Sequence, residues 1–171
     1  TLCESIERIV SAKPDTQFVL PLAPNLDRRL IDGIVQQRPV TVVTDDAYNA
    51  IRYARAAIVA SGTATLETAL LGTPEVIVYR ISGATWFLGK FLLKVRLFGI
   101  VNIILGEEVA PELFQDKFTP DLVSRAAIKL MDDVWIQSRI RGKYELLRKS
   151  LGGGNAPQRV AEAVARVLNT S

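Results

Sequence analysis

Apolar and polar residues alternate along the first half of the chain with two different periods. Apolar residues recur at helical spacing over residues 2–10, and the pattern stops at the Lys-Pro-Asp turn of residues 13–15. A short apolar run over residues 17–22, closed by prolines, predicts a strand. Helical spacing returns over residues 26–36, and we expect Asn25 to cap that helix. The chain is therefore predicted to open as helix, strand and helix.

The same alternation then repeats. Apolar runs predict strands over residues 40–44, 57–60 and 76–79, and helical patterns predict helices over residues 46–54 and 63–71. The strands are continuous apolar runs, which is typical of parallel strands covered by helices on both faces. This pattern predicts an α/β fold with a doubly wound parallel sheet.

The pattern changes after the last of these strands. A very apolar helix is predicted over residues 85–97 and a short strand over residues 100–105. Helices are predicted over residues 119–131, 134–149 and 158–168.

Three consecutive glycines, residues 152–154, form a joint before the last predicted helix. We expect one folded domain over residues 1–150. Residues 151–171 then form the glycine-rich joint and a terminal amphipathic helix.

The amino-acid composition limits which catalytic and metal sites this chain can form. The 171 residues are 49% apolar and 23% charged, enough for a sizeable core, and 21 Lys and Arg stand against 18 Asp and Glu. The chain has no histidine and a single cysteine, Cys3, so histidine-based nucleophilic catalysis and the common zinc sites are excluded on this chain. We expect no metal or cofactor, and no nucleic acid partner, because the net charge is only +3.

Two further features concern location. The longest stretches without a charge are 11 residues, too short for a membrane-spanning helix, and a lone cysteine favours the cytoplasm. The sequence opens inside a helical pattern and without methionine, and we expect it to be a fragment of a longer protein.

The turn after the third predicted strand combines small and hydroxyl residues at the start of a helix. Gly62 allows close backbone approach, while Ser61, Thr63 and Ala64 leave room for a phosphate at the helix start. Glu67 lies four residues after Thr63, about 6 Å along the axis, which suits a ribose one turn from a diphosphate. The alternative is that Ser61 or Thr63 simply caps the helix.

A 31-residue segment, residues 76–106, contains no Asp or Glu and carries four basic residues among many apolar ones. One interpretation is a core helix whose lysines extend outward. The other is a membrane-surface patch or an acyl-chain groove beside an anion. The candidate lipid or membrane contacts are Trp86, Phe87, Lys90, Phe91 and Lys94.

Four short motifs together carry a family resemblance. They cover residues 60–67 (ASGTATLE), 71–74 followed by 78–80 (LGTP and VYR), 102–108 (NIILGEE) and 111–115 (PELFQ). In their order and spacing, the chain from about residue 17 onward resembles the C-terminal half of lipid A disaccharide synthases. These are inverting glycosyltransferases of the GT-B type with two Rossmann-like domains.

The resemblance implies a donor-binding half of a hexosyltransferase. The donor would be UDP-2,3-diacylglucosamine, the acceptor 2,3-diacylglucosamine 1-phosphate, and the products UDP and a β-1,6-linked lipid A disaccharide. The residues that would contact the UDP donor are Ser61, Gly62, Thr63, Ala64, Glu67, Asn102 and Glu108. Tyr79 and Arg80 would lie at the rim. The alternatives are a backbone-satisfying role for Asn102 and simple packing for Tyr79 and Arg80.

Two departures from the family pattern bear on these expectations. Val101 stands where the family has proline, and Glu107 stands where it has arginine, which reverses a charge where phosphates are expected. The loop after the domain's first strand and the acceptor domain would lie upstream of Thr1. We therefore expect no catalytic residue on this chain, with the general base in the acceptor domain.

The resemblance also implies peripheral attachment to an anionic membrane surface, the cytoplasmic face of the inner membrane of a Gram-negative bacterium, and allows an oligomer. Two other functions stay open. One is a UDP-N-acetylglucosamine transferase or epimerase of the same fold, and the other is a non-catalytic interaction domain.

Overall fold

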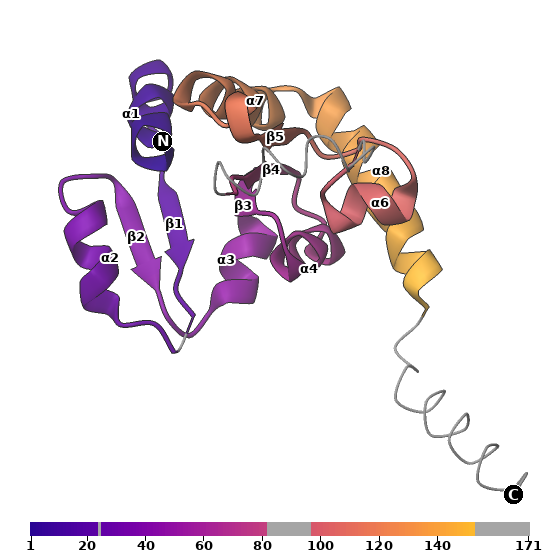
Figure 1. Ribbon diagram of the computed structural model, residues 1–171, viewed down its shortest axis with the longest axis horizontal. Coiled ribbons are helices and arrows are strands. Elements are labelled where there is room, and N and C mark those ends of the chain that lie inside the picture. Colours follow the sequence, from indigo (N-terminus) through magenta and orange to yellow (C-terminus); the bar gives the residue numbers. More distant parts are fainter. Residues whose placement is uncertain (24, 82–96, 153–171) are drawn as a thin grey trace, which may run out of the picture.

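The computed structural model describes residues 1–23, 25–81 and 97–152 (Figure 1). The predicted helix over residues 158–168 lies outside the described residues, as does all but the last residue of that over 85–97. The same holds for the candidate membrane contacts Trp86, Phe87, Lys90, Phe91 and Lys94.

The first part of the chain alternates as the sequence predicts. The elements are α1 (Leu2–Ala12), β1 (Phe18–Pro21), α2 (Arg28–Val35), β2 (Val40–Val43) and α3 (Ala47–Tyr53). One detail is wrong: Asp27, not Asn25, caps α2, because its side chain accepts a hydrogen bond from the Arg29 N–H at 2.9 Å. The aspartate stands directly before the first helical residue, which is the N-cap position.

The second part holds the larger sheet and its covering helices. Its elements are β3 (Ala57–Ala60), α4 (Thr63–Leu71), β4 (Glu75–Tyr79), α6 (Ile100–Leu105), β5 (Glu112–Phe114), a short 3-10 helix η1 (Gln115–Lys117), α7 (Pro120–Asp132) and α8 (Val134–Leu151).

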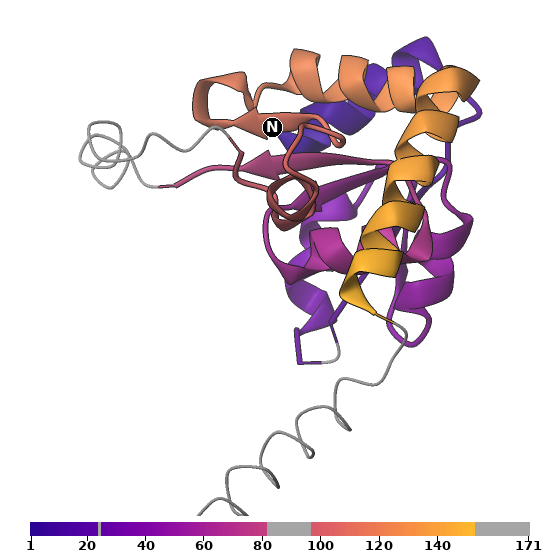
Figure 2. The same cartoon turned by 90° about the vertical axis from the view of Figure 1, so that its right-hand side faces the viewer.

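All strand pairs are parallel, which confirms the predicted fold class. The strands lie in two sheets, β1–β2 and β3–β4–β5, rather than in one (Figure 1). Among the described residues, β1, β2, β3 and β5 each have one edge without a strand partner. In Figure 2 the orange α7 lies on one face of the larger sheet and the magenta α4 on the other. This sheet is therefore covered on both sides, as its continuous apolar strands require.

The strand predicted over residues 100–105 is wrong, because this segment forms α6. The run Ile-Val-Asn-Ile-Ile-Leu is rich in β-branched residues, and a short apolar run does not distinguish a strand from a helix. In the structure Val101 and Asn102 are buried while Ile103 and Ile104 are exposed, so burial changes with helical spacing. The strand that pairs with β4 on the side away from β3 is β5, which the sequence pattern did not reveal.

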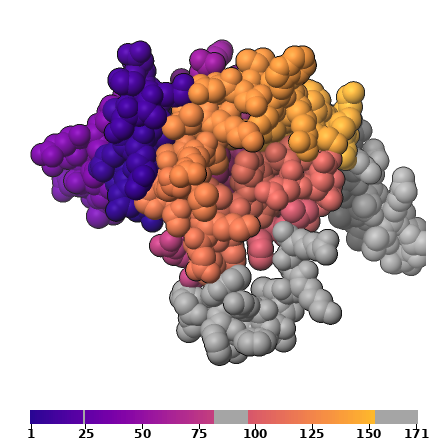
Figure 3. Space-filling view, turned by 90° about the horizontal axis from the view of Figure 1, so that it is seen from above, coloured from indigo at the N-terminus to yellow at the C-terminus, as the bar shows by residue number. Residues whose placement is uncertain are grey.

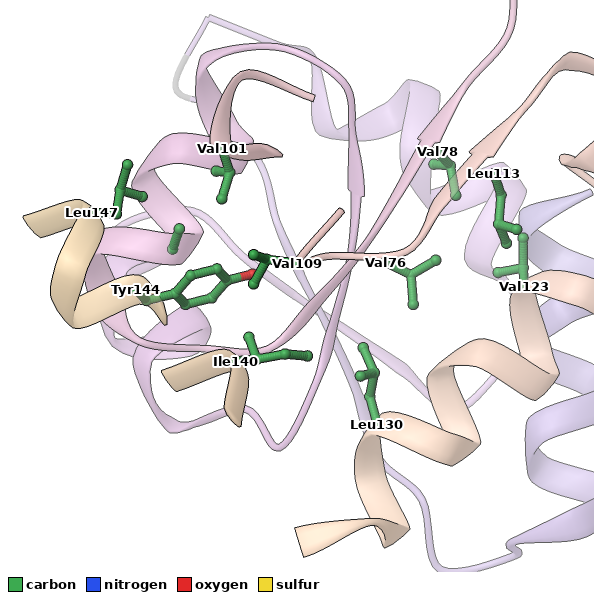
Figure 4. Close-up of a cluster of buried hydrophobic side chains, with 11 residues drawn as sticks. Val76, Val78, Val101, Val109, Leu113, Val123, Leu130, Ile140, Tyr144 and Leu147 are labelled. Atoms are coloured by element: carbon green, nitrogen blue, oxygen red, sulfur yellow. The ribbon is translucent and has the colours of Figure 1, made fainter. Parts of the chain in front are cut away.

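The main core forms around β4, between the sheet and the helices that cover it. Figure 4 shows side chains from β4, β5, α6, α7 and α8 converging there. The buried cluster comprises Ala69, Val76, Val78, Val101, Val109, Leu113, Val123, Leu130, Ile140, Tyr144 and Leu147. At the surface, α1 lies against α7 (Figure 3), and an ion pair between Lys13 and Asp132, 2.7 Å long, joins the chain after α1 to the end of α7. No helix in the described ranges is long and apolar enough to cross a membrane.

One core side chain is acidic. Glu75 begins β4, and its side chain is fully buried beneath α8. The Tyr144 hydroxyl donates a hydrogen bond to Oε1 at 3.3 Å, and Oε2 has no hydrogen-bond partner among the described residues. Burial raises the pKa of Glu75 from an ordinary 4.5 to about 9, against a smaller lowering by the Tyr144 hydrogen bond. The carboxyl group is therefore neutral at neutral pH.

Candidate functional site

The carboxyl edge of the β3–β4–β5 sheet brings the sequence motifs together. Because the strands are parallel, Ser61 after β3, Tyr79 at the end of β4 and Phe114 at the end of β5 reach the same edge. Side-chain contacts also link the motifs. The Ser61 hydroxyl lies 3.5 Å from the Phe98 carbonyl oxygen, and the Gln115 amide donates to the Ile81 carbonyl at 3.2 Å. Ligands of open α/β sheets bind at such an edge.

The start of α4 is open at this edge. Gly62 is its N-cap residue, with φ 157° and ψ −164°, a conformation almost restricted to glycine. A Cβ atom added at Gly62 would meet nothing within 4 Å, so the space before the helix is free of described residues. No described side chain caps the helix, so the alternative that Ser61 or Thr63 serves as a side-chain cap is wrong. The exposed N–H groups and the helix dipole at Thr63 and Ala64 are suited to an anion.

Glu67 lies one turn further along α4 and is exposed. Its carboxylate makes no ion pair or hydrogen bond with the described residues. By contrast, the hydroxyls of Thr65 and Thr68 on the buried side of α4 donate back to the carbonyls of Gly62 and Ala64, at 2.7 and 2.8 Å. Glu67 is therefore the polar side chain of α4 beyond its first turn that is free to meet a ligand.

Asn102 is fully buried in α6. Its Nδ2 donates to the Ala110 carbonyl at 2.7 Å and to Oε1 of Glu112 at 2.7 Å. Its Oδ1 accepts from the backbone N–H groups of Val109 at 2.9 Å and Ala110 at 3.0 Å. A carboxamide has two donor hydrogens and two acceptor lone pairs, so all of its capacity is used inside the protein. The arrangement is the backbone-satisfying alternative, and it brings no polar atom of Asn102 to the open edge.

Glu112, at the start of β5, binds the backbone of the two residues before α6. Its Oε2 accepts from the Phe98 N–H at 2.8 Å, and its Oε1 accepts from the Gly99 N–H at 2.9 Å. The packing is tight, because a Cβ on Gly99 would collide with Cδ1 of Ile77 and lie 3.1 Å from Oε1 of Glu112. Glu112 lies within the PELFQ motif, and the sequence predicts no role for it. Its role depends on the burial of Asn102, which the structure alone shows.

Aromatic rings line the same edge. The Phe98 and Phe114 rings stack with centroids 4.4 Å apart and an interplanar angle of 5°, and Tyr79 stacks on Phe114 at 5.6 Å. Tyr79, at the end of this aromatic ladder, remains 40% exposed. Arg80 donates to the Phe118 carbonyl at 2.7 Å and places its guanidinium 5.1 Å from the Phe118 ring centroid. Tyr79 and Arg80 thus pack and border the edge at once.

The two acidic residues after α6 face different surroundings. Glu107 pairs with Lys143 and, at 3.9 Å, with Arg139, both on α8. The hydrogen bond from Lys143 lowers the pKa of Glu107 below its ordinary value. The negative charge of Glu107, which the sequence predicts near the phosphates, is therefore neutralised by basic side chains of α8. Glu108 is exposed, and its carboxylate lies 3.4 Å from the backbone N of Glu112.

The described residues contain no cluster of side chains that could hold a metal ion. The site is defined instead by an open helix N-terminus, a free carboxylate one turn on and an aromatic ladder beside them. The crystal structure of the glycotransferase of kitacinnamycin has a similar fold, with a TM-score of 0.60 at 20% identity over 95% of this chain and 38% of that one. The chain therefore has the fold of a glycosyltransferase domain.

The family follows from sequence comparison. The lipid-A-disaccharide synthetase family model matches residues 1–161, and the chain belongs to that family. It is 37% identical to the lipid-A-disaccharide synthase of Geobacter sulfurreducens over 98% of this chain and 44% of that protein. It is 36% identical to that of Trichlorobacter lovleyi over the whole chain and 45% of that protein. The chain thus spans less than half the length of these curated relatives.

Proposed function

We propose that this chain is the donor-binding half of a lipid-A-disaccharide synthase. The full-length protein would transfer 2,3-diacylglucosamine from UDP to 2,3-diacylglucosamine 1-phosphate, giving the β-1,6-linked disaccharide and UDP. The observation that carries the proposal is the open start of α4, which lies within the residues that the family model matches and has no side-chain cap among the described residues. The family's relatives are bacterial, which agrees with this chemistry.

The geometry supports a specific placement of the donor. The diphosphate lies against the backbone of residues 61–64, and the ribose hydroxyls reach the free carboxylate of Glu67. Glu108 lies near the donor, and Tyr79 and Arg80 form the rim. Asn102 acts on this site through its neighbours rather than by contact, since its hydrogen bonds are all internal.

The proposed reaction makes one bond and breaks one. The acceptor hydroxyl oxygen attacks the anomeric carbon of the donor, and the bond from that carbon to the diphosphate oxygen breaks with inversion. The hydroxyl proton goes to a carboxylate base outside this chain. The role of this chain is to stabilise charge on the departing diphosphate with fixed N–H groups of α4.

Replacing Glu67 with alanine tests the donor placement. We expect the full-length protein to bind UDP about tenfold more weakly, because hydrogen bonds to a charged carboxylate are lost. Isothermal titration with UDP measures this. If charge repulsion between Glu67 and the diphosphate were the only effect, the substitution would instead strengthen UDP binding, so weaker binding indicates lost hydrogen bonds.

The matched control is Glu145→Ala, which removes an exposed carboxylate from α8. It should leave UDP affinity unchanged. Equal affinities for wild type and Glu67→Ala would contradict the ribose placement, and failure of the wild-type protein to bind UDP would overturn the proposed function.

We also propose peripheral membrane attachment through the acid-free segment of residues 76–106, because both substrates carry acyl chains and anionic surfaces attract its lysines. We expect the full-length protein to sediment with anionic vesicles at low salt and to be released at high salt. The double substitution Lys90→Gln and Lys94→Gln should weaken this binding. A protein that stays in solution with anionic vesicles at low salt would overturn the attachment.

A further inference from the structure

Asn102, which is fully buried, and Glu112, which is half-buried, form a clamp between the start of β5 and the chain before and within α6. We define the Glu112 clamp as the Glu112 carboxylate, the Asn102 carboxamide and the backbone N–H groups of Phe98 and Gly99. Three hydrogen bonds link these groups, all between 2.7 and 2.9 Å, and Asn102 is held further by its bonds to Val109 and Ala110. The clamp ties three separate pieces of chain together: the residues before α6, α6 itself and the start of β5.

The clamp determines what stands beside the open start of α4. It fixes Phe98, whose carbonyl oxygen lies 3.5 Å from the Ser61 hydroxyl. It also fixes the Phe98 ring, on which Phe114 and then Tyr79 stack. The Glu112 carboxylate therefore sets the position of the aromatic ladder relative to Ser61, because it holds the backbone of Phe98. Several anchored hydrogen bonds to one carboxylate hold such geometry closely.

The clamp leaves little freedom for an alternative arrangement. Asn102 is fully buried and uses both donors and both acceptors, and a Cβ at Gly99 would require the Ile77 side chain to shift. A change in either side chain leaves a buried or half-buried donor or acceptor without its partner, and a displacement of Phe98 would relieve it.

From this geometry we infer that Glu112 and Asn102 are positioning residues for the donor site: without touching the donor, they hold Phe98 and the aromatic ladder against the Ser61 turn. This inference rests on the proposed function, since it assigns the clamp to the UDP site. It predicts that breaking the clamp weakens donor binding and leaves acceptor binding unchanged.

The test uses Glu112→Gln in the full-length protein. The new amide group points N–H donors at backbone N–H groups, so the clamp loses at least one acceptor while the side chain keeps its size. We expect faster hydrogen exchange at the Phe98 and Gly99 amides, a UDP dissociation constant raised about tenfold and a donor KM raised with it. The acceptor KM should not change. A merely destabilised protein loses active molecules instead, which lowers kcat and leaves the donor KM of the remainder unchanged.

The matched control is Gln137→Ala, far from the edge. Gln137 is buried, and its amide joins α8 to the end of α7 through the carbonyls of Leu130 at 2.7 Å and Met131 at 3.1 Å. Its loss removes a comparable buried hydrogen-bonding group and should not move UDP affinity. Where Glu112→Gln does not fold, Glu112→Asp provides the same test, because the shorter side chain cannot reach Phe98, Gly99 and Asn102 together.

The outcomes separate the inference from the proposed function. Faster exchange at Phe98 and Gly99 together with weakened UDP binding supports the inference. Faster exchange with wild-type UDP affinity overturns the inference and leaves the proposed function standing. A wild-type protein that binds no UDP overturns both.

Discussion

Glu75→Gln is expected to remove a large pH dependence of stability from this domain. In the folded protein burial raises the pKa of Glu75 to about 9, while the unfolded chain has an ordinary value near 4.5. Between these values the folded state keeps a proton that the unfolded state has released. The free energy of unfolding therefore falls as pH rises, by about 1.4 kcal/mol per pH unit from this one group.

The effect has a defined window. The contribution of Glu75 is fully present below about pH 4.5, declines through neutral pH and is lost once the pH passes about 9. Between pH 5 and pH 8 the wild-type protein should lose about 4 kcal/mol relative to Glu75→Gln, on the order of 10 °C in melting temperature. Urea unfolding at both pH values measures it, and hydrogen exchange in β4 and α8 identifies the transition of this domain.

Two further variants define the cause. Tyr144→Phe removes the hydroxyl that donates to Glu75 at 3.3 Å, so the pKa of Glu75 should rise further and the decline should extend to higher pH. Glu145→Gln, an exposed carboxylate on the same helix, should leave the pH dependence unchanged. Parallel pH profiles for wild type and Glu75→Gln would contradict the buried neutral carboxyl.

The fold was predictable where the sequence carries strong local signals. Continuous apolar runs predicted the strands at residues 40–44, 57–60 and 76–79 to within one residue at each end, and β4, whose run is the most buried, is covered on both faces as such runs indicate. The strand β5 was missed because its three residues are too few to show a period. The division into two sheets was missed as well, since strand pairing depends on residues far apart in sequence.

The site was predictable only in part. A small-residue turn after a strand indicated the open helix start, because Gly62 has the backbone freedom that this turn requires. The role of Asn102 was not predictable, because a functional asparagine and one that satisfies backbone groups look alike in sequence. Glu75 gave no signal, since nothing in the run around it shows that α8 covers its side chain.

Gly62→Ala is expected to weaken UDP binding by up to about 100-fold, because a turn strained by up to about 3 kcal/mol no longer holds the conformation that the donor requires. The physical reason lies in the backbone. At φ 157° and ψ −164° an alanine is strained by about 1 to 3 kcal/mol, so the turn must shift. Its methyl group would also enter the open space before α4, where the diphosphate is proposed to lie. Titration of the full-length protein with UDP measures the loss.

The other end of the same helix provides the control. Gly72 is the C-cap of α4 in the left-handed conformation, φ 84° and ψ 14°, and a Cβ there also meets nothing within 4 Å. Gly72→Ala therefore strains the backbone of α4 by about 1 to 2 kcal/mol without approaching the proposed diphosphate. Both variants should lower the free energy of unfolding, while only Gly62→Ala should weaken UDP binding. If both weaken binding equally, strain within α4 is responsible and the diphosphate does not lie at Gly62. The contrast between the two glycines thus separates the stability of the helix from its use as an anion site.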